Sequence, residues 1–96
     1  MRVRKKPGAL DALMAKERYF IGDPEACKGK WKAVFGNDQP LHAEFGGGKG
    51  KFIIEMATKY PEINFIMVDA VKEVTLKAVE KAEEVDLPNL RIIMID

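Results

Sequence analysis

The second half of the sequence shows a regular alternation that constrains the fold more than any other feature. Short apolar runs at 41–45, 64–69 and 90–95 are separated by segments at 52–60 and 71–82, where apolar residues recur at helical spacing. Strands that alternate with helices of about ten to fifteen residues form βαβ units with right-handed crossovers. The predicted fold class is therefore α/β, a βαβαβ parallel sheet that forms one half of a doubly wound fold.

The residues before this sheet divide into two segments. Residues 1–8 are expected to form a flexible basic arm, and residues 9–39 an N-terminal helical segment that precedes the domain at 40–96. Apolar spacing predicts one helix over 9–18 and a second over 24–35. The second helix has capping signals at both of its ends, Asp23 before it and Gly36 after it.

The composition is that of a globular protein, with 47% hydrophobic and 32% charged residues. The single cysteine, Cys27, excludes an intrachain disulfide and a cysteine-based metal site. No apolar run approaches the ~20 residues that a membrane span requires, and no secretory signal opens the sequence. We therefore expect a cytoplasmic protein that binds no metal and no membrane.

The formal net charge of +1 conceals an asymmetry between the two ends of the chain. Four basic residues and no acid lie among the first six residues, and without these four the net charge becomes −3. A short basic arm on an acidic body can bind nucleic-acid phosphates, although four charges alone also fit a solvated terminus. The candidate RNA-binding residues are Arg2, Arg4, Lys5 and Lys6.

A glycine-rich loop, residues 44–50, joins the first strand of the alternation to the helix after it. A tight turn, close approach of a ligand and a helix that begins beside the strand all favour glycine here. A Walker loop is excluded because Phe52 follows Lys51 where that motif needs serine or threonine, and the glycines also miss the G-x-G-x-x-G spacing. The spacing that remains, E-x-G-x-G-x-G, is typical of S-adenosylmethionine-dependent methyltransferases.

Three acidic residues stand at the ends of successive predicted strands. Asp69 follows Gly50 by 19 residues, and a carboxylate there can accept both ribose hydroxyls of a nucleoside. Ligands of open α/β sheets bind outside the carboxyl ends of the strands, so the sequence predicts a nucleoside-bearing cofactor at this edge. The candidate cofactor-binding residues are Glu44, Gly46, Gly48, Gly50, Asp69 and Asp96.

Several further stretches resemble the N-terminal part of bacterial tRNA (guanine-N7-)-methyltransferases. The resemblance implies a Rossmann-like, class I S-adenosylmethionine-dependent methyltransferase fold, of which 40–96 would be the part up to the third strand. It implies that S-adenosylmethionine lies across Glu44, the glycine loop, Asp69 and Asp96, and that tRNA is the partner of the basic arm. The stretches that carry it are Met1–Lys6, Lys28–Trp31, Val34–Asp38, Pro40–Glu44 and Pro61–Phe65, in addition to the glycine loop.

The sequence departs from the family pattern in three respects. Asp69 stands where glutamate is usual, so the ribose contact would span one methylene less, and Gly47 replaces a small side chain. The stretch that holds the target guanine in the family, Asp-Pro-Trp-Pro-Lys-Lys-Arg-His, does not occur in the 96 residues. We therefore expect the catalytic residues downstream, and the 96-residue chain to be a cofactor-binding fragment that is inactive alone. Guanine N7 carries a lone pair, so catalysis would need alignment rather than a general base.

The residues leave two alternative functions open, and the resemblance adds an expectation about association. The alternatives are a small dinucleotide-binding domain that takes NAD, and a nucleotide- or RNA-binding module without catalysis. In the family, the first strand lies in the middle of the sheet beside a later strand that is absent here. Leu41 to Phe45 would then be an open edge, so we expect self-association, aggregation or marginal stability.

Overall fold

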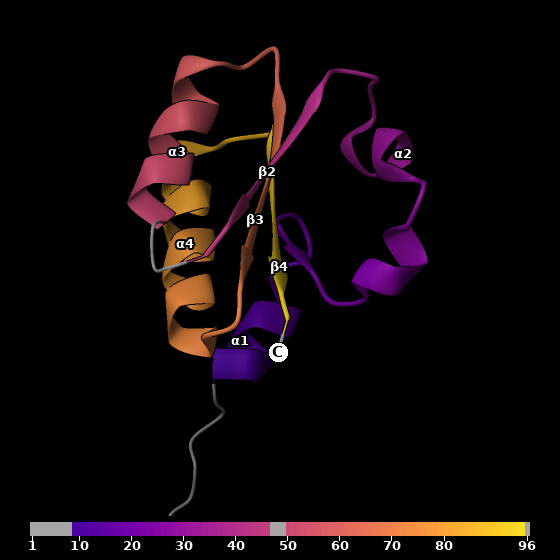
Figure 1. Ribbon diagram of the computed structural model, residues 1–96. Helices are drawn as coiled ribbons and strands as arrows, with labels where there is room; N and C mark the ends of the chain where they lie inside the picture. The colour runs from indigo at the N-terminus through magenta and orange to yellow at the C-terminus, as the bar shows by residue number, and fades with distance from the viewer. Residues whose placement is uncertain (1–8, 47–49, 96) are drawn as a thin grey trace, which may run out of the picture.

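The computed structural model describes residues 9–46 and 50–95, with side chains from residue 12 onward. The basic arm at 1–8 lies outside the described residues. The elements in chain order are α1 (Ala9–Met14), β1 (Phe20–Ile21), a 3₁₀ helix (Pro24–Cys27), α2 (Trp31–Phe35), β2 (Leu41–Phe45), α3 (Gly50–Lys59), β3 (Asn64–Asp69), α4 (Lys72–Val85) and β4 (Leu90–Met94) (Figure 1).

The four strands form one parallel sheet in the order β1-β4-β3-β2. Leu41 of β2 lies opposite Asn64 of β3, and Phe65 of β3 lies opposite Leu90 of β4. With α3 and α4 as crossovers, β2, β3 and β4 confirm the predicted βαβαβ unit of an α/β fold. Within the described residues β2 is an edge strand, as the sequence analysis expected.

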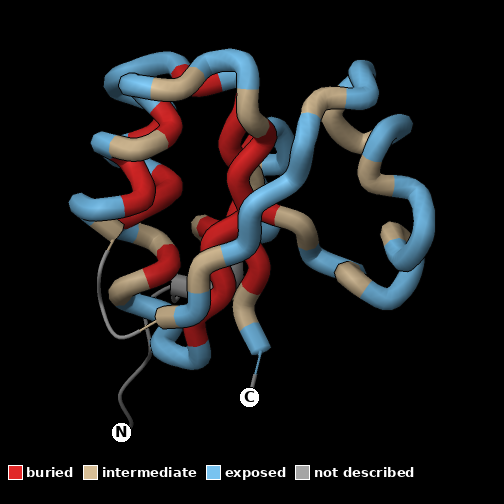
Figure 2. The backbone as a smooth tube through the Cα atoms, turned by 45° about the horizontal axis from the view of Figure 1, so that its top comes forward, coloured by how far each residue is buried: buried red, intermediate tan, exposed pale blue. Residues whose placement is uncertain are grey.

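Neighbouring strands of this sheet differ sharply in burial. All six residues of β3 are buried, whereas β2 is exposed along its length except at the half-buried Glu44. Figure 2 shows this contrast as a pale β2 in front of a red β3. A central parallel strand is covered on both faces and by a neighbour on each side, which explains the continuous apolar run of β3.

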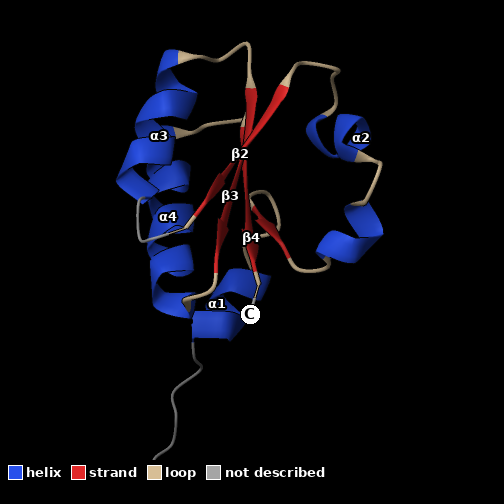
Figure 3. Ribbon diagram, in the orientation of Figure 1, coloured by secondary structure: helices blue, strands red, loops and turns tan. Residues whose placement is uncertain are grey.

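Helices cover the two faces of the sheet unequally (Figure 3). One face packs against α3 and α4, and α1 packs against α4 on the same side. The other face carries a small cluster of three buried side chains, against which the half-buried Trp31 and Phe35 of α2 pack. These three buried residues are Ile66, Val68 and Ile93.

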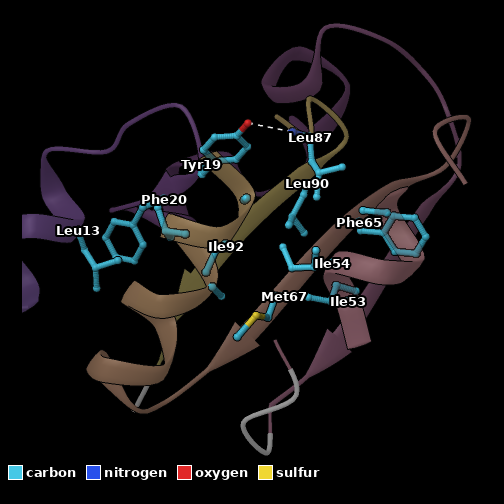
Figure 4. Close-up of a cluster of buried hydrophobic side chains, with 14 residues drawn as sticks. Leu13, Tyr19, Phe20, Ile53, Ile54, Phe65, Met67, Leu87, Leu90 and Ile92 are labelled. Atoms are coloured by element: carbon cyan, nitrogen blue, oxygen red, sulfur yellow. Dashed lines mark hydrogen bonds between the residues drawn. The ribbon is translucent and has the colours of Figure 1, made fainter. Parts of the chain in front are cut away.

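The main core lies between the sheet and α1, α3 and α4, and it includes residues from both halves of the chain (Figure 4). Leu13 of α1 is fully buried, and so is Tyr19 immediately before β1. The Tyr19 hydroxyl accepts a hydrogen bond of 3.0 Å from the backbone N–H of Leu87. This bond fixes the N-terminal segment to the turn that leads into β4, in addition to the pairing of β1 with β4.

The N-terminal segment differs from its prediction in two ways. The single helix expected over 24–35 is wrong: a 3₁₀ helix and α2 take its place, separated by Gly29 with φ 73°. A left-handed residue interrupts the helical hydrogen-bond pattern, so the chain turns between the two short helices. The helix expected over 9–18 ends at Met14, and a strand, β1, follows that was not predicted.

The capping residues of this segment are confirmed. The Asp23 side chain accepts a hydrogen bond from the N–H of Ala26 (3.4 Å), and Pro24 occupies the first turn. Gly36 ends α2 in the left-handed conformation with φ 79°. Local capping signals were therefore sufficient to locate the outer ends of the segment, although they could not show the break inside it.

Candidate functional site

The carboxyl ends of β2 and β3 meet at Gly46. The N–H of Gly46 donates a 2.6 Å hydrogen bond to the carbonyl of Val68. A Cβ placed on Gly46 would lie 3.2 Å from Oδ2 of Asp69 and 3.4 Å from the Val68 carbonyl oxygen. Glycine is therefore favoured at this position, because a side chain would crowd the nearby carboxylate. The sequence analysis placed these two residues at one edge of the sheet, and the structure brings them into contact.

Asp69 is buried, with 5% of its surface exposed, and its carboxylate is held in a defined orientation. Its Oδ1 accepts a hydrogen bond from the N–H of Val71 (2.9 Å), the residue that precedes the first turn of α4. The Asp69 carbonyl also accepts a hydrogen bond from the N–H of Ile95 (2.9 Å). The carboxyl group thus serves the turn into α4 with one oxygen, while the other oxygen faces Gly46.

Gly50, one of the predicted cofactor-binding residues, lies close to the neighbouring crossover helix. It is the first residue of α3, and a Cβ placed on it would lie 3.3 Å from the Cβ of Ala78 in α4. The small residue at this position allows the two crossover helices to pack closely at the start of α3. Its contact is therefore with the neighbouring helix, which the sequence spacing did not indicate.

Glu44 has a partner that the sequence analysis missed. Its Oε2 lies 2.7 Å from Nε2 of His42, and both side chains are nearly half exposed on β2. The His42 ring is tilted against the ring of Phe65, at 5.5 Å between centroids. Residues two apart on a strand share a face, so the pairing could have been found from the spacing alone. The predicted cofactor contact of Glu44 therefore requires its carboxylate to bind the cofactor as well as His42.

The remaining predicted site residues lie outside the described part of the chain. Over residues 12–46 and 50–95, no group of three or more metal-ligating side chains comes together. No helix in the described part of the chain has the length and apolar character needed to cross a membrane. The predicted residues that lie outside the description are Gly48, Asp96, Arg2, Arg4, Lys5 and Lys6.

A surface hollow of about 610 Å³ lies between α3 and α4. It is lined by Gly50, Ile54 and Ala78 together with lysine and glutamate side chains of the two helices. Neither Glu44 nor Asp69 lines it, so this hollow is separate from the contact between Gly46 and Asp69. The candidate site is placed at the strand ends because Gly46 and the Asp69 carboxylate lie close together there.

These features define the class of the protein. A parallel sheet with crossover helices presents a buried carboxylate beside a glycine at the carboxyl ends of adjacent strands, which is the arrangement of a Rossmann-like cofactor-binding unit. The family described as "Putative methyltransferase" matches residues 38–96, and the chain belongs to this family. The match confirms the fold class and the methyltransferase family that the sequence indicated.

Curated relatives extend the similarity over the N-terminal segment as well. A tRNA (guanine-N(7)-)-methyltransferase of Geobacillus thermodenitrificans is 48% identical over 93 residues, which cover 97% of this chain and 43% of that protein. Proteins of the same name from Listeria monocytogenes and Streptococcus suis are 49% and 43% identical over the whole chain, which covers 45% of each. The chain therefore spans less than half the length of these relatives.

Proposed function

We propose that this chain provides the S-adenosylmethionine-binding part of a tRNA (guanine-N7-)-methyltransferase. The observation that carries the proposal is the close approach of the Gly46 backbone to the buried Asp69 carboxylate at the carboxyl edge of the sheet. The names of the relatives supply the substrate and the position of the methyl group.

The residues at this edge fit S-adenosylmethionine. Gly46 carries no side chain beside Oδ2 of Asp69, and a carboxylate at the end of the second strand of such a sheet can accept hydrogen bonds from ribose hydroxyls. The hydrogen bond from Val71 holds the Asp69 carboxyl group in one orientation. A group that is already oriented loses less conformational entropy when a ligand binds, which favours binding. Glu44 contributes a second negative charge, which favours a cationic ligand, and Asp96 would contact the adenine side. The bound cofactor supplies a methyl group on a positively charged sulfur.

In the proposed reaction, the protein aligns the reacting atoms and binds the phosphates of the tRNA. Guanine N7 carries a lone pair and needs no general base, so the protein must bring N7, the methyl carbon and the sulfur into line. We assign Arg2, Arg4, Lys5 and Lys6 to contacts with tRNA phosphates. The residues that hold the guanine are proposed to lie in the part of the relatives that this chain does not match. A tRNA substrate implies a cytoplasmic location.

Calorimetric titration of the 96-residue chain with S-adenosylmethionine tests the cofactor assignment, with NAD as a parallel titrant. We expect S-adenosylmethionine to bind and NAD not to bind. The variant Asp69→Asn keeps an oxygen that can accept from Val71 but loses the charge at the ribose, and should weaken binding about tenfold or more. Asp86→Asn is the matched control, because it removes one exposed carboxylate at the end of α4 and should leave the affinity unchanged.

Circular dichroism of each variant shows whether the fold is retained. A folded wild-type chain that does not bind S-adenosylmethionine, or that binds only NAD, would overturn the proposal. Equal affinities of Asp69→Asn and the wild type would remove Asp69 from the site. RNA binding by a folded chain that takes neither cofactor would favour the alternative of an RNA-binding module.

A further inference from the structure

His42 is the only histidine of the chain, and it lies in β2 two residues before Glu44. Its ring is tilted at 57° against the ring of Phe65, with 5.5 Å between the centroids. Phe65 is 1% exposed and belongs to the main core. The His42 ring is therefore placed by a buried neighbour on β3, and not only by its contact with Glu44.

Glu44 and Asp69 present their carboxylates to the same face of the sheet. In the parallel register Glu44 lies opposite Met67, and Asp69 follows Met67 by two residues. Residues two apart on a strand share a face, and so do residues opposite each other on neighbouring strands. Both carboxylates therefore lie on the face that carries the main core, near the carboxyl ends of adjacent strands. This is the end of the sheet at which Gly46 approaches Asp69.

The contact with His42 uses only one of the two oxygens of the Glu44 carboxylate. Nε2 of His42 lies 2.7 Å from Oε2, and the ring nitrogen donates because an ionised carboxylate can only accept. Among the described residues, Oε1 accepts no hydrogen bond. A glutamate side chain is long and flexible, so a partner at one oxygen restricts the orientations that the carboxylate would otherwise sample. The contact thus orients Glu44 and leaves its second oxygen to a ligand.

We propose that His42 is a positioning residue for the cofactor: it holds Glu44 through Oε2 so that Oε1 can bind S-adenosylmethionine. This inference rests on the proposed function, since it assumes that Glu44 contacts the cofactor. His42 itself needs no contact with the cofactor, because its ring lies one turn of the pleat further from the carboxyl end of β2 than Glu44 does.

The hydrogen bond between His42 and Glu44 should become stronger when a ligand binds. In the free chain both side chains are nearly half exposed, so water competes for the same groups and the bond contributes little. A ligand that covers Glu44 excludes this water, and a hydrogen bond to a charged group is stronger where the local dielectric constant is lower. Only the difference between the bound and free states adds to the affinity. The weak contact of the free chain can therefore contribute measurably to cofactor binding.

A purely structural role for His42, packing against Phe65, makes the opposite demand on the side chain. Packing needs the aromatic ring, whereas positioning needs a donor at the place of Nε2. His42→Phe keeps a ring of similar size but has no donor. His42→Gln loses the ring, but its amide nitrogen can take the place of Nε2 and donate to Glu44. The two variants therefore separate the two roles.

Calorimetric titration of the wild-type chain and both variants with S-adenosylmethionine tests the proposal. His42→Phe should weaken binding about fivefold or more, and His42→Gln should stay within about twofold of the wild type. In a chain that also carries Glu44→Ala, His42→Phe should have no further effect, because His42 acts through that carboxylate. Thermal unfolding followed by circular dichroism shows whether each variant retains the fold.

A measurement on the wild-type chain keeps the test decisive if a variant fails to fold. Because His42 is the only histidine, its imidazole nitrogen signals in an NMR spectrum are unambiguous, and the Nε2 signal should shift on saturation with S-adenosylmethionine. An unchanged signal would overturn the proposal, and so would weaker binding by His42→Gln than by His42→Phe. Equal affinities of the wild type and His42→Phe would overturn this inference alone. A folded wild-type chain that binds no S-adenosylmethionine would overturn the proposed function and this inference with it.

Discussion

The strands β2 and β3 lie side by side, run in the same direction and are in register, yet their surroundings differ completely. Phe65 of β3 is 1% exposed, while Phe45 of β2 is 74% exposed. Both strands contain large apolar residues, so the residue types alone do not account for the difference. What differs is the number of neighbours: β3 lies between β2 and β4, and β2 has only β3 among the described strands. Position in the strand order therefore decides how much a side chain contributes to stability.

Alanine substitutions of the two phenylalanines should give the largest difference between the strands. Phe65→Ala should lower the free energy of unfolding by about 3–5 kcal/mol, because it removes a fully buried ring from the main core. Phe45→Ala should change it by less than about 0.5 kcal/mol when the chain is monomeric. Urea unfolding at low protein concentration measures both values, and equal losses would show that β2 is covered in solution.

A smaller difference is expected between the amide side chains that precede two of the strands. Asn89, before β4, is buried and donates to the carbonyls of Ala57, Tyr60 and Ile63 at 2.9–3.1 Å. Asn89→Ala leaves these carbonyls without that donor, and should cost about 1–3 kcal/mol of unfolding free energy.

The matched control is Gln39, which lies before β2. Gln39 donates to the carbonyl of Pro61 and to the side chain of Asn64, nearer the surface. Gln39→Ala should cost less than about 1 kcal/mol, because water can replace the amide. Thermal or urea unfolding measures both losses of unfolding free energy. A larger loss for Gln39→Ala than for Asn89→Ala would contradict the expected difference between the residues before β2 and those before β4.

The smallest effect is expected for the pair of His42 and Glu44 on β2. Their side chains are 46% and 40% exposed, so solvent screens the interaction despite the 2.7 Å contact. A double-mutant cycle with His42→Ala and Glu44→Ala should give a coupling of at most about 0.5 kcal/mol in the monomer. A coupling of more than about 2 kcal/mol would show that this surface of β2 is shielded from water.

The βαβαβ unit could be predicted from the sequence because its signals are local and repeated. The strands predicted at 41–45 and 64–69 have these bounds in the structure. Each is an apolar run bounded by glycine, proline or a polar turn, so its ends are marked as well as its centre. The approach of Asp69 to Gly46 could also be predicted, since parallel strand ends meet at one edge of the sheet.

Other features depend on contacts that no local pattern contains. The two residues of β1 are too few to show a period, and they form a strand only because β4 lies beside them. Gly50 lies close to Ala78 of the next helix. This contact depends on how the two crossover helices pack, which the spacing of residues in the sequence does not show. The break at Gly29 could not be predicted, because the sequence does not show that this glycine adopts a left-handed conformation rather than a helical one.

The pairing of β1 with β4 has a consequence for how the chain folds as it is made. Phe20 lies opposite Ile92, and the hydroxyl of Tyr19 is bonded to Leu87, 68 residues further along the chain. On a ribosome, which adds residues from the N-terminus onward, β1 therefore has no strand to join until β4 has been synthesised and released from the exit tunnel. Contacts between such distant residues close late and slow folding. During synthesis, the N-terminal segment must wait unpaired while the βαβαβ unit forms.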